Sequence, residues 1–583
     1  MHADLSRITY RPERHYSAVV AQQGRVQLDA DANEQTALQL FQARTLATDL
    51  IGPHGGPHGA TGFKVDLRGG PHELDDLVIG GGRYYVDGIL CDATRPRPGT
   101  PVPATAHQEG APDPADAPAA PAADETWTYW NQPDGFRDPE RPGDRLPSHF
   151  PYLVYLKVWE RLVTAAEDPA LREVALGAAL PDTAARTKVV WQVLPLPAAE
   201  LELDGDNPPA ADIRTAFDRW AHKAATPACR LAARSERPDH GDDDPCLVAP
   251  EARYRGPENQ LYRIEVHEGG AAEDATFKWS RENGSPTFQV DELDGTWVEL
   301  ASLGGDDKLS LHVGDWVEFV DTAYSSRGEA APLLRVEEVD LPGRRVRLSD
   351  EPAPGVGRRP ELHPFLRRWD HQEPGRGTSG PRGSSRRTVR HGDRTGRLRH
   401  GALPVEEGGW LPLEDGLEVY FESGGAYRTG DFWLVPSRTA TGGVEWPTDP
   451  ARRPLLQHPA GIAVHYAPLA WVHGEQAVPD LRLAFRPLAT DIPAAGDAAP
   501  ATTDAPASPD TGGYADSGDS GDHGDDFGGS GAPGAGDGGR GGDGGRGLGT
   551  LSTGPDGGSG PARPRSQTTA EAEAQVDETG VVD

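Results

Sequence analysis

The sequence predicts a mainly β protein built from several modules, with an amphipathic helix near its start and a disordered acidic tail at its end. Short runs in which apolar and polar side chains alternate recur along the chain, and 152–163 is the clearest of them. Turn-forming pairs such as Asn283-Gly284 and Asp294-Gly295 separate the runs between 261 and 348, a density typical of a small barrel or sandwich, and Asn283-Gly284 is expected to close a hairpin. At 583 residues the chain is too long for one core, so we expect about two to four domains.

The N-terminal helix is predicted from a cap, a stop and an apolar stripe. Asp31 stands where a helix N-cap belongs, with Glu34 three residues further on as its capping-box partner. The helix should run to about Ile51, where Gly52-Pro53 ends it. One stripe on its surface is formed by Ala37, Leu40, Ala43, Ala47 and Leu50. Such a stripe needs a surface to cover it, either the rest of this chain or a neighbouring subunit.

The next elements follow from turn residues and periodicity. Asp87-Gly88, flanked by aromatic and β-branched residues, predicts a hairpin, whereas the Pro- and Ala-rich segment 95–125 predicts a linker or disordered loop. Alternation at 152–163 and 188–194 predicts strands with one covered face and one wetter face. Apolar residues at helical spacing predict a short helix over 210–224.

The second half of the chain alternates between strand-rich and low-complexity segments. From Gly375 to His400 there are eight Arg and one Asp among small polar residues, which predicts a disordered insertion. It is interpreted either as a tether to an acidic partner or to the acidic tail, or as a solvated loop. The predicted ranges are a docking unit at 1–94, a linker at 95–125, a β-rich module with a short helix at 126–235, a small barrel or sandwich at 245–371, the Arg-rich insertion at 372–400, a β-rich module at 401–490 and a disordered Gly/Asp-rich tail at 491–583.

Several motifs resemble a known family. The opening stretch contains Gln22-Gln23-Gly24-Arg25-Val26, Leu28-Asp29-Ala30-Asp31 and Asn33-Glu34-Gln35. It is similar to the start of an uncharacterised family of phage-tail-like proteins encoded with extracellular contractile injection systems. Later segments also look like that family, and they lie at 82–88, 152–161, 276–281 and 427–433. The resemblance covers roughly residues 5–485.

The resemblance implies a structural component of a contractile phage-tail-like injection particle, at or near its baseplate. Its partners would be baseplate or other subunits of the particle, with several copies of this chain present. The family has no catalytic motif to transfer. We expect the N-terminal unit to be the attachment element, with candidate contact residues Arg25, Asp29, Asp31, Asn33, Glu34, Leu40 and Leu50.

Charge, cysteines and hydropathy exclude several classes of protein. The net charge of −34 argues against a general nucleic-acid binder, which needs a positive field. Cys91, Cys229 and Cys246 have no metal-binding spacing and are expected to be buried small hydrophobes. The chain starts with polar sequence and contains no apolar run of membrane-spanning length. We therefore expect synthesis in the cytoplasm without membrane insertion, followed by incorporation into an intracellular or released particle.

No catalytic, cofactor-binding or metal-binding residue is predicted. The sequence lacks the phosphate-loop, H-E-x-x-H and G-x-S-x-G patterns. A pair of carboxylates that are distant in sequence would escape such a search, so a particle-associated hydrolase stays as one alternative. A receptor- or glycan-binding appendage is the other alternative. Its candidate recognition side chains are loop aromatics for which a role in the core is the competing interpretation, namely Trp410, Tyr427, Trp433 and Trp446.

Overall fold

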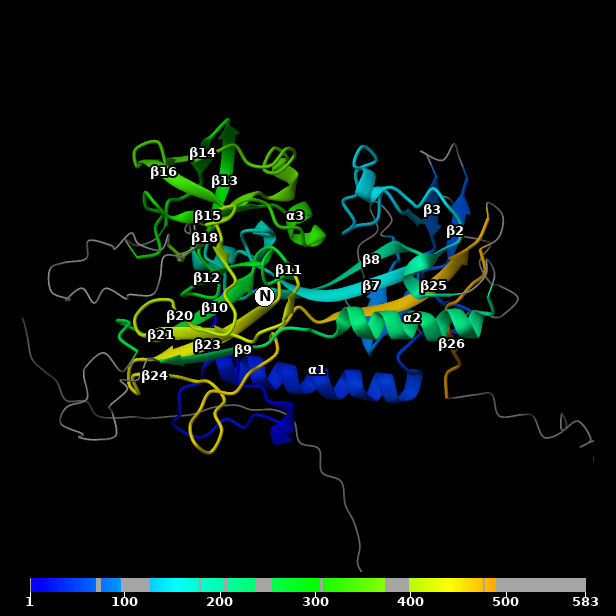
Figure 1. Cartoon of the computed structure of the whole chain (residues 1–583), viewed down its shortest axis with the longest axis horizontal. Helices are drawn as coiled ribbons and strands as arrows, with labels where there is room; N and C mark the ends of the chain where they lie inside the picture. The colour runs from blue at the N-terminus through cyan, green and yellow to red at the C-terminus, as the bar shows by residue number, and fades with distance from the viewer. Residues whose placement is uncertain are drawn as a thin grey trace, which may run out of the picture. The chain divides into compact units, whose positions relative to one another are not determined.

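The computed structural model describes residues 2–69, 75–95, 126–177, 180–203, 208–235, 254–304, 308–372, 398–474 and 478–488. Within these ranges the fold is mainly β, as predicted, and its strands form several sheets (Figure 1). The α-helices there are α1 (Asp29–Ile51), α2 (Ala210–Ala225) and α3 (Thr322–Arg327). Short 3-10 helices lie at Pro12–Arg14, Pro142–Asp144, Pro169–Leu171, Val174–Leu176, Ala198–Leu201 and Pro360–Leu362. The predictions for 95–125, 372–400 and 491–583 fall mainly or wholly outside the described residues, as does Cys246.

The longest strands form an antiparallel sheet in the order β25 (Val464–Val472), β7 (Tyr152–Val163) and β8 (Arg186–Pro197). The predicted alternation along β7 is confirmed. Val154 and Leu156 point into one buried cluster, and Leu153 and Tyr155 into another on the opposite face. The prediction of a wetter face is wrong for this strand, because Phe217 of α2 packs over Tyr155 and excludes water from it.

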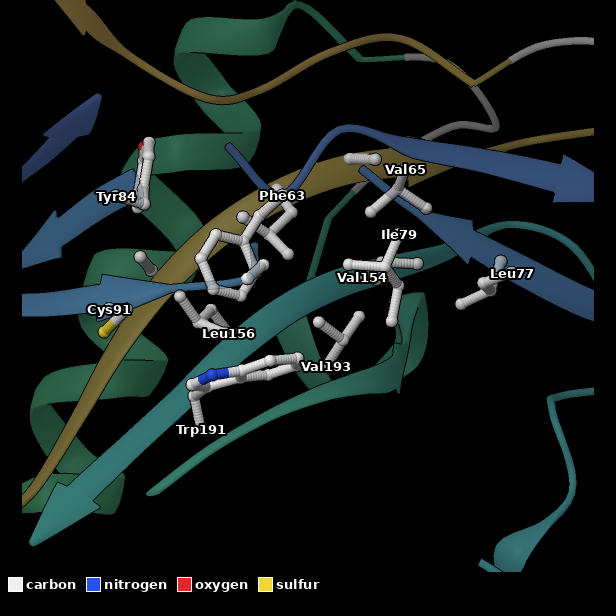
Figure 2. Close-up of a cluster of buried hydrophobic side chains, with 14 of the residues drawn as sticks. Phe63, Val65, Leu77, Ile79, Tyr84, Cys91, Val154, Leu156, Trp191 and Val193 are labelled. Atoms are coloured by element: carbon white, nitrogen blue, oxygen red, sulfur yellow. The ribbon is translucent and has the colours of Figure 1, made fainter. Parts of the chain in front are cut away.

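Two small sheets, built mostly from N-terminal strands, cover the face of β7 that carries Val154 and Leu156. Phe63 packs edge-on against Trp191 of β8, with 5.0 Å between ring centroids, and the buried Cys91 belongs to the same cluster (Figure 2). The hairpin predicted at Asp87-Gly88 is confirmed, because both residues have positive φ between two paired strands. The two sheets are β26 (Ala484–Phe485), β1 (His54–Pro57), β4 (Arg83–Val86) and β5 (Ile89–Asp92), and β2 (Val65–Arg68), β3 (Asp76–Ile79) and β6 (Trp127–Thr128).

A second core lies between two further sheets. Its centre includes Tyr262, Trp279, Phe421 and Trp433, all buried. One sheet has the order β19 (Leu403–Pro404), β12 (Thr276–Ser280), β10 (Gln260–Val266), β23 (Phe432–Arg438) and β24 (Gly443–Val444). The other is β20 (Trp410–Pro412), β21 (Leu417–Phe421) and β9 (Leu231–Ser235), and a short pair joins β11 (Gly270–Ala271) to β22 (Ala426–Tyr427).

A closed six-stranded barrel is inserted between β12 and β19 (Figure 1). Its order is β13 (Thr287–Asp294), β14 (Trp297–Leu300), β17 (Arg345–Leu348), β16 (Leu334–Asp340), β15 (Trp316–Val320) and β18 (Phe365–Trp369). The Asp294-Gly295 turn joins the paired strands β13 and β14, as its sequence predicts. Asn283-Gly284 was expected to make a hairpin, and this is wrong. Both residues have positive φ, but the turn leads from β12 of the open sheet into β13 of the barrel.

The modules are therefore intertwined in sequence. Strands β10 and β12, from the predicted range 245–371, share a sheet with β23 from the range 401–490. All described residues belong to one compact unit that spans 1–492.

Candidate functional site

The N-terminus of α1 is capped differently from the prediction. The helix begins at Asp29, so Leu28 is its N-cap residue and Asp31 is at the third helical position. The Asp31 carboxylate accepts a hydrogen bond from the Leu28 N–H at 3.2 Å. This is one of the two hydrogen bonds of a capping box, the one from the backbone N–H of the N-cap residue to the side chain at the third helical position. Glu34 does not act as the capping partner of Asp31, because it accepts a hydrogen bond from the Thr9 hydroxyl at 2.5 Å.

Acidic residues of α1 hold the preceding segment in place. Asp29 accepts hydrogen bonds from both the N–H and the hydroxyl of Ser6, at 2.9 and 2.6 Å. Burial alone would raise the pKa of Asp29, but these hydrogen bonds outweigh burial and lower it. The Ser6 carbonyl in turn accepts from Arg438 of β23 at 3.1 Å. Of the predicted contact residues, Asp29, Asp31 and Glu34 therefore serve this chain, whereas Arg25 and Asn33 are exposed.

The body of α1 is anchored through its backbone and one ion pair. A Cβ atom at Gly88 would lie 2.4 Å from the carbonyl oxygen of Arg44, so the hairpin turn at 87–88 packs directly on the helix. Arg44 also pairs with Glu160 of β7 at 2.7 Å. In α1 only Ala30 and Leu38 are buried. The helix consequently rests on the chain along a narrow contact.

The predicted apolar stripe of α1 faces away from the core. Ala37 and Ala47 are half-buried at its edge, but Leu40, Ala43 and Leu50 are exposed. Leu46 and Leu50 each keep 60% of their surface accessible, and Phe41 keeps 50%. The segment before the helix adds further exposed apolar side chains, namely Ile8, Tyr16, Val20, Val26 and Leu28. We call α1 residues 40–50 together with these five side chains the apolar N-terminal face.

The four candidate recognition aromatics divide into two pairs. Trp433 and Tyr427 are buried in the core between the sheets, so neither offers a surface to a ligand. Trp433 donates to the Gln457 carbonyl at 2.9 Å, and Tyr427 donates to Glu407 at 2.8 Å. Trp410 and Trp446 are half-buried. The Trp410 ring is covered by the guanidinium of Arg234, which lies 4.0 Å from its centroid.

A cluster of buried charges that was not predicted from the sequence lies where β10 and β12 meet the barrel. Lys278 of β12 lies 3.2 Å from Glu265 of β10 and 2.8 Å from Glu318 of β15. Arg263 pairs with Glu265 at 2.5 Å, and Arg367 of β18 lies 3.6 Å from Glu318. All five side chains are at least nine-tenths buried.

The electrostatics of the cluster keep its carboxylates ionised. Burial would raise the pKa of Glu265, but Arg263 and Lys278 outweigh burial and hold it well below its usual range. Burial would likewise raise the pKa of Glu318, but Lys278 and Arg367 outweigh burial and lower it. The nearby His267 behaves differently, because burial lowers its pKa to about 3 and leaves the ring neutral at physiological pH.

One sequence signal could have indicated the cluster. In the predicted strand 261–267, charged or titratable residues alternate with apolar ones at Arg263, Glu265 and His267. From that pattern only a short strand was predicted. The charged face of this strand is dry because Lys278, opposite Glu265 on β12, contacts Glu318, which lies opposite Arg367 on the barrel, so the two charged faces meet.

Among the described residues, no His, Cys, Asp and Glu side chains form a group of three or more suited to a metal ion. Within the same residues, no helix combines the length and apolarity needed to cross a membrane.

The matching family model is described as a family of unknown function (DUF6519), and it covers residues 1–224, 204–380 and 384–517. No curated protein and no solved structure matches the chain.

Proposed function

Because the chain belongs to the DUF6519 family, whose function is unknown, we propose a function from its own motifs and surface. The protein is a structural subunit of a contractile phage-tail-like injection particle, at or near the baseplate, and its apolar N-terminal face docks it onto a different subunit. The motifs from Gln22 to Gln35 and the segment 427–433 support the particle assignment through their resemblance to phage-tail-like proteins.

The observation that carries the docking role is the outward direction of the α1 stripe. Leucine side chains at 40, 46 and 50 lie in water although the same chain buries leucines fully elsewhere, as at Leu156. Full burial of one leucine stabilises a complex by about 1.5–3 kcal/mol before the costs of association. The stripe and its flanking side chains thus favour a partner that presents an apolar groove to a helix.

The internal hydrogen bonds of the segment support the same role. Ser6 and Thr9 are fixed to α1 by Asp29 and Glu34, so the exposed side chains at 8–28 are presented next to the helix in the free chain. Val19 is held in the same way, since its N–H donates to Gln35 at 2.7 Å. A preordered surface loses less conformational entropy on binding than a loose one. In this proposal the chain is made in the cytoplasm and then incorporated into the particle in several copies.

The test replaces two exposed leucines and asks whether the protein still enters particles. Leu46→Glu with Leu50→Glu places two charges in the proposed interface, and we expect the variant to be absent from particles purified from the producing cells. Leu176→Glu is the matched control, because Leu176 has the same 60% exposure but lies in a 3-10 helix elsewhere. That variant should be incorporated normally.

Four results would contradict the proposal. One is normal incorporation of the double variant, and another is equal loss of the Leu176→Glu control. The third is a wild-type chain that never sediments with particles. Self-association of the purified chain that the double variant abolishes would assign the face to a second copy of this protein and contradict docking onto a different subunit.

A further inference from the structure

A cavity of about 120 Å³ lies beside the buried charge cluster. Cavities of about 150 Å³ accommodate ligands the size of benzene, so this one has room for a molecule of a few heavy atoms. Unlike an apolar void, its wall is rich in charged groups. Its titratable lining includes Arg161, Arg263, Glu265, His267, Lys278, Glu318, Glu329 and Arg367.

The two carboxylates of the cluster are already fully engaged. Glu265 contacts Arg263 at 2.5 Å, His2 at 2.8 Å and Lys278 at 3.2 Å. Glu318 accepts hydrogen bonds from Lys278 at 2.8 Å and from Tyr324 and Trp369, each at 3.1 Å. These donors come from both the open sheet and the barrel, which fixes both acids in place.

The cations of the cluster outnumber the acids. Arg263, Lys278 and Arg367 face Glu265 and Glu318, so one positive charge is left without a carboxylate of its own. Two other charged groups at the cavity wall have partners of their own and do not change this difference, because Arg161 pairs with Glu167, and Glu329 with Arg327 and Arg141. An uncompensated charge in a buried place is unfavourable unless a counter-ion or solvent neutralises it.

Arg367 is the surplus cation. Its nearest carboxylate oxygen, on Glu318, is 3.6 Å away, too far for a hydrogen bond, and that oxygen accepts from Trp369 instead. The Arg367 Nε–H is buried and has no partner among the described residues. Since a guanidinium carries five N–H donors, Arg367 can offer a pair of them to an oxyanion.

Two more groups at the cavity wall lack partners among the residues described. Both ring nitrogens of His267 are buried without a hydrogen bond, and so is the Nε–H of Arg161. A neutral imidazole has one donor and one acceptor, so the unused groups comprise three N–H donors and one acceptor. An occupant rich in oxygen acceptors would fit this wall.

We propose that the cavity between the β10–β12 sheet and the barrel binds a small monovalent oxyanion, a carboxylate or a phosphate, through Arg367 and His267. The anion neutralises the surplus cation and accepts the donors that the protein leaves unused. Its binding therefore fastens the barrel to the sheet. This anion site is independent of the proposed role as a subunit of an injection particle.

The test is a titration of the purified full chain with sodium acetate and, separately, with sodium phosphate at constant ionic strength. We expect saturable one-site binding by calorimetry and a rise in melting temperature with anion concentration. Arg367→Gln should weaken binding by about tenfold or more, since it removes a charge-assisted pair of donors. The matched control is Arg368→Gln, because Arg368 is equally buried but donates to the carbonyls of Lys308 and Ser310 and does not line the cavity.

The outcomes distinguish a carboxylate ligand from a phosphate ligand, and some of them would reject the proposed anion site. Tighter binding of acetate would assign a carboxylate, and tighter binding of phosphate a phosphate. No saturable binding, equal binding by Arg367→Gln, or equal stabilisation by chloride would overturn the proposal and leave water or a simple ion as the occupant. A crystal grown with arsenate, an unreactive oxyanion of the same shape as phosphate, tests the wild-type chain without any variant, because the arsenic anomalous signal must lie beside Arg367.

Discussion

Helix α1 and the strand pair β10–β12 invert the usual arrangement of side chains in opposite ways. The helix turns Leu46 and Leu50 into water, whereas the strands enclose Arg263, Glu265 and Lys278. Elsewhere the molecule is conventional, as on β7, where both faces meet apolar cores. Both inversions cost free energy in the isolated chain unless a partner, a ligand or a charged neighbour compensates.

The difference between the two regions lies in where that compensation comes from. Within the described residues, the charges of β10 and β12 are matched by one another and by Glu318 of the barrel, and Arg367 of β18 is the surplus cation. The apolar N-terminal face has no such internal match in the described structure. The charge cluster should therefore matter for the stability of the chain, and the apolar face for its association.

The largest effect is expected from Lys278→Met. The lysine bridges Glu265 and Glu318 and is only 3% exposed, so its loss takes a close cationic partner away from both buried carboxylates. We expect a loss of about 3–5 kcal/mol in the free energy of unfolding, measured by urea denaturation. Lys64→Met is the control, because the Lys64–Asp66 pair is more than half exposed and should contribute less than about 1 kcal/mol. Equal effects of the two variants would show that the cluster is not stabilising.

A pair of identical substitutions compares the core directly with the helix face. Leu156→Ala in β7 should cost about 2–5 kcal/mol, because it opens a cavity in a closely packed cluster. Leu46→Ala in α1 should change the free energy of unfolding by less than about 0.5 kcal/mol. A large loss at Leu46 in the isolated chain would mean that α1 packs on this chain more closely than the structure shows.

Local patterns were enough to predict the elements but not their environment. The alternation of β7, the turn at Asp87-Gly88 and the helix near 210–224 all follow from neighbouring residues, and the structure confirms them. The extent to which a face is covered depends on distant segments. Tyr155 is dry because Phe217 arrives from α2, and the Asn283-Gly284 turn joins two sheets because β13 pairs with β18.

The same difference between local patterns and distant contacts explains which features of the two sites could be predicted from sequence. The α1 stripe was visible from its spacing, but nothing local shows which side of a helix meets the core. The charge cluster was not predicted because Lys278 and Glu318 are 40 residues apart in sequence, and their contact requires the barrel to close over the sheet. Likewise, Asp31 was predicted as the N-cap residue, but the helix begins about one turn earlier, so that Asp31 lies at its third position.

A buried carboxylate outside the cluster, Asp144, gives a milder, pH-dependent test of charges in the interior. Asp144 accepts hydrogen bonds from Arg327, Asp138 N–H and Arg137, which outweigh burial and lower its pKa to about 2. Since the folded pKa lies below the unfolded value of 3.8, its stabilisation is present above about pH 4 and is lost as the pH falls towards 2.

Denaturation of wild type and Asp144→Asn across this range checks the sign. Wild type should be more stable by about 1 kcal/mol near neutral pH, allowing for solvent screening, and the difference should shrink as the pH falls from 4 towards 2. A difference that grows on acidification would contradict the assigned pKa shift.

The smallest effect on stability is expected from the double variant Leu46→Glu with Leu50→Glu. Both positions are already in water, so circular-dichroism melting should move little, by about 0.5 kcal/mol or less in the free energy of unfolding. This result is needed for the particle experiment, because a variant that unfolds would be lost from particles for a trivial reason.

The most direct measurement is the accessibility of the apolar N-terminal face inside an assembled particle. Single variants Leu46→Cys and Leu176→Cys can be labelled with a maleimide in the free chain and in purified particles, with wild type as the background for the native cysteines. Both positions should react in the free chain. In the particle, Cys at 46 should become unreactive while Cys at 176 still labels, whereas equal labelling of the two in the particle would contradict a docking role for α1.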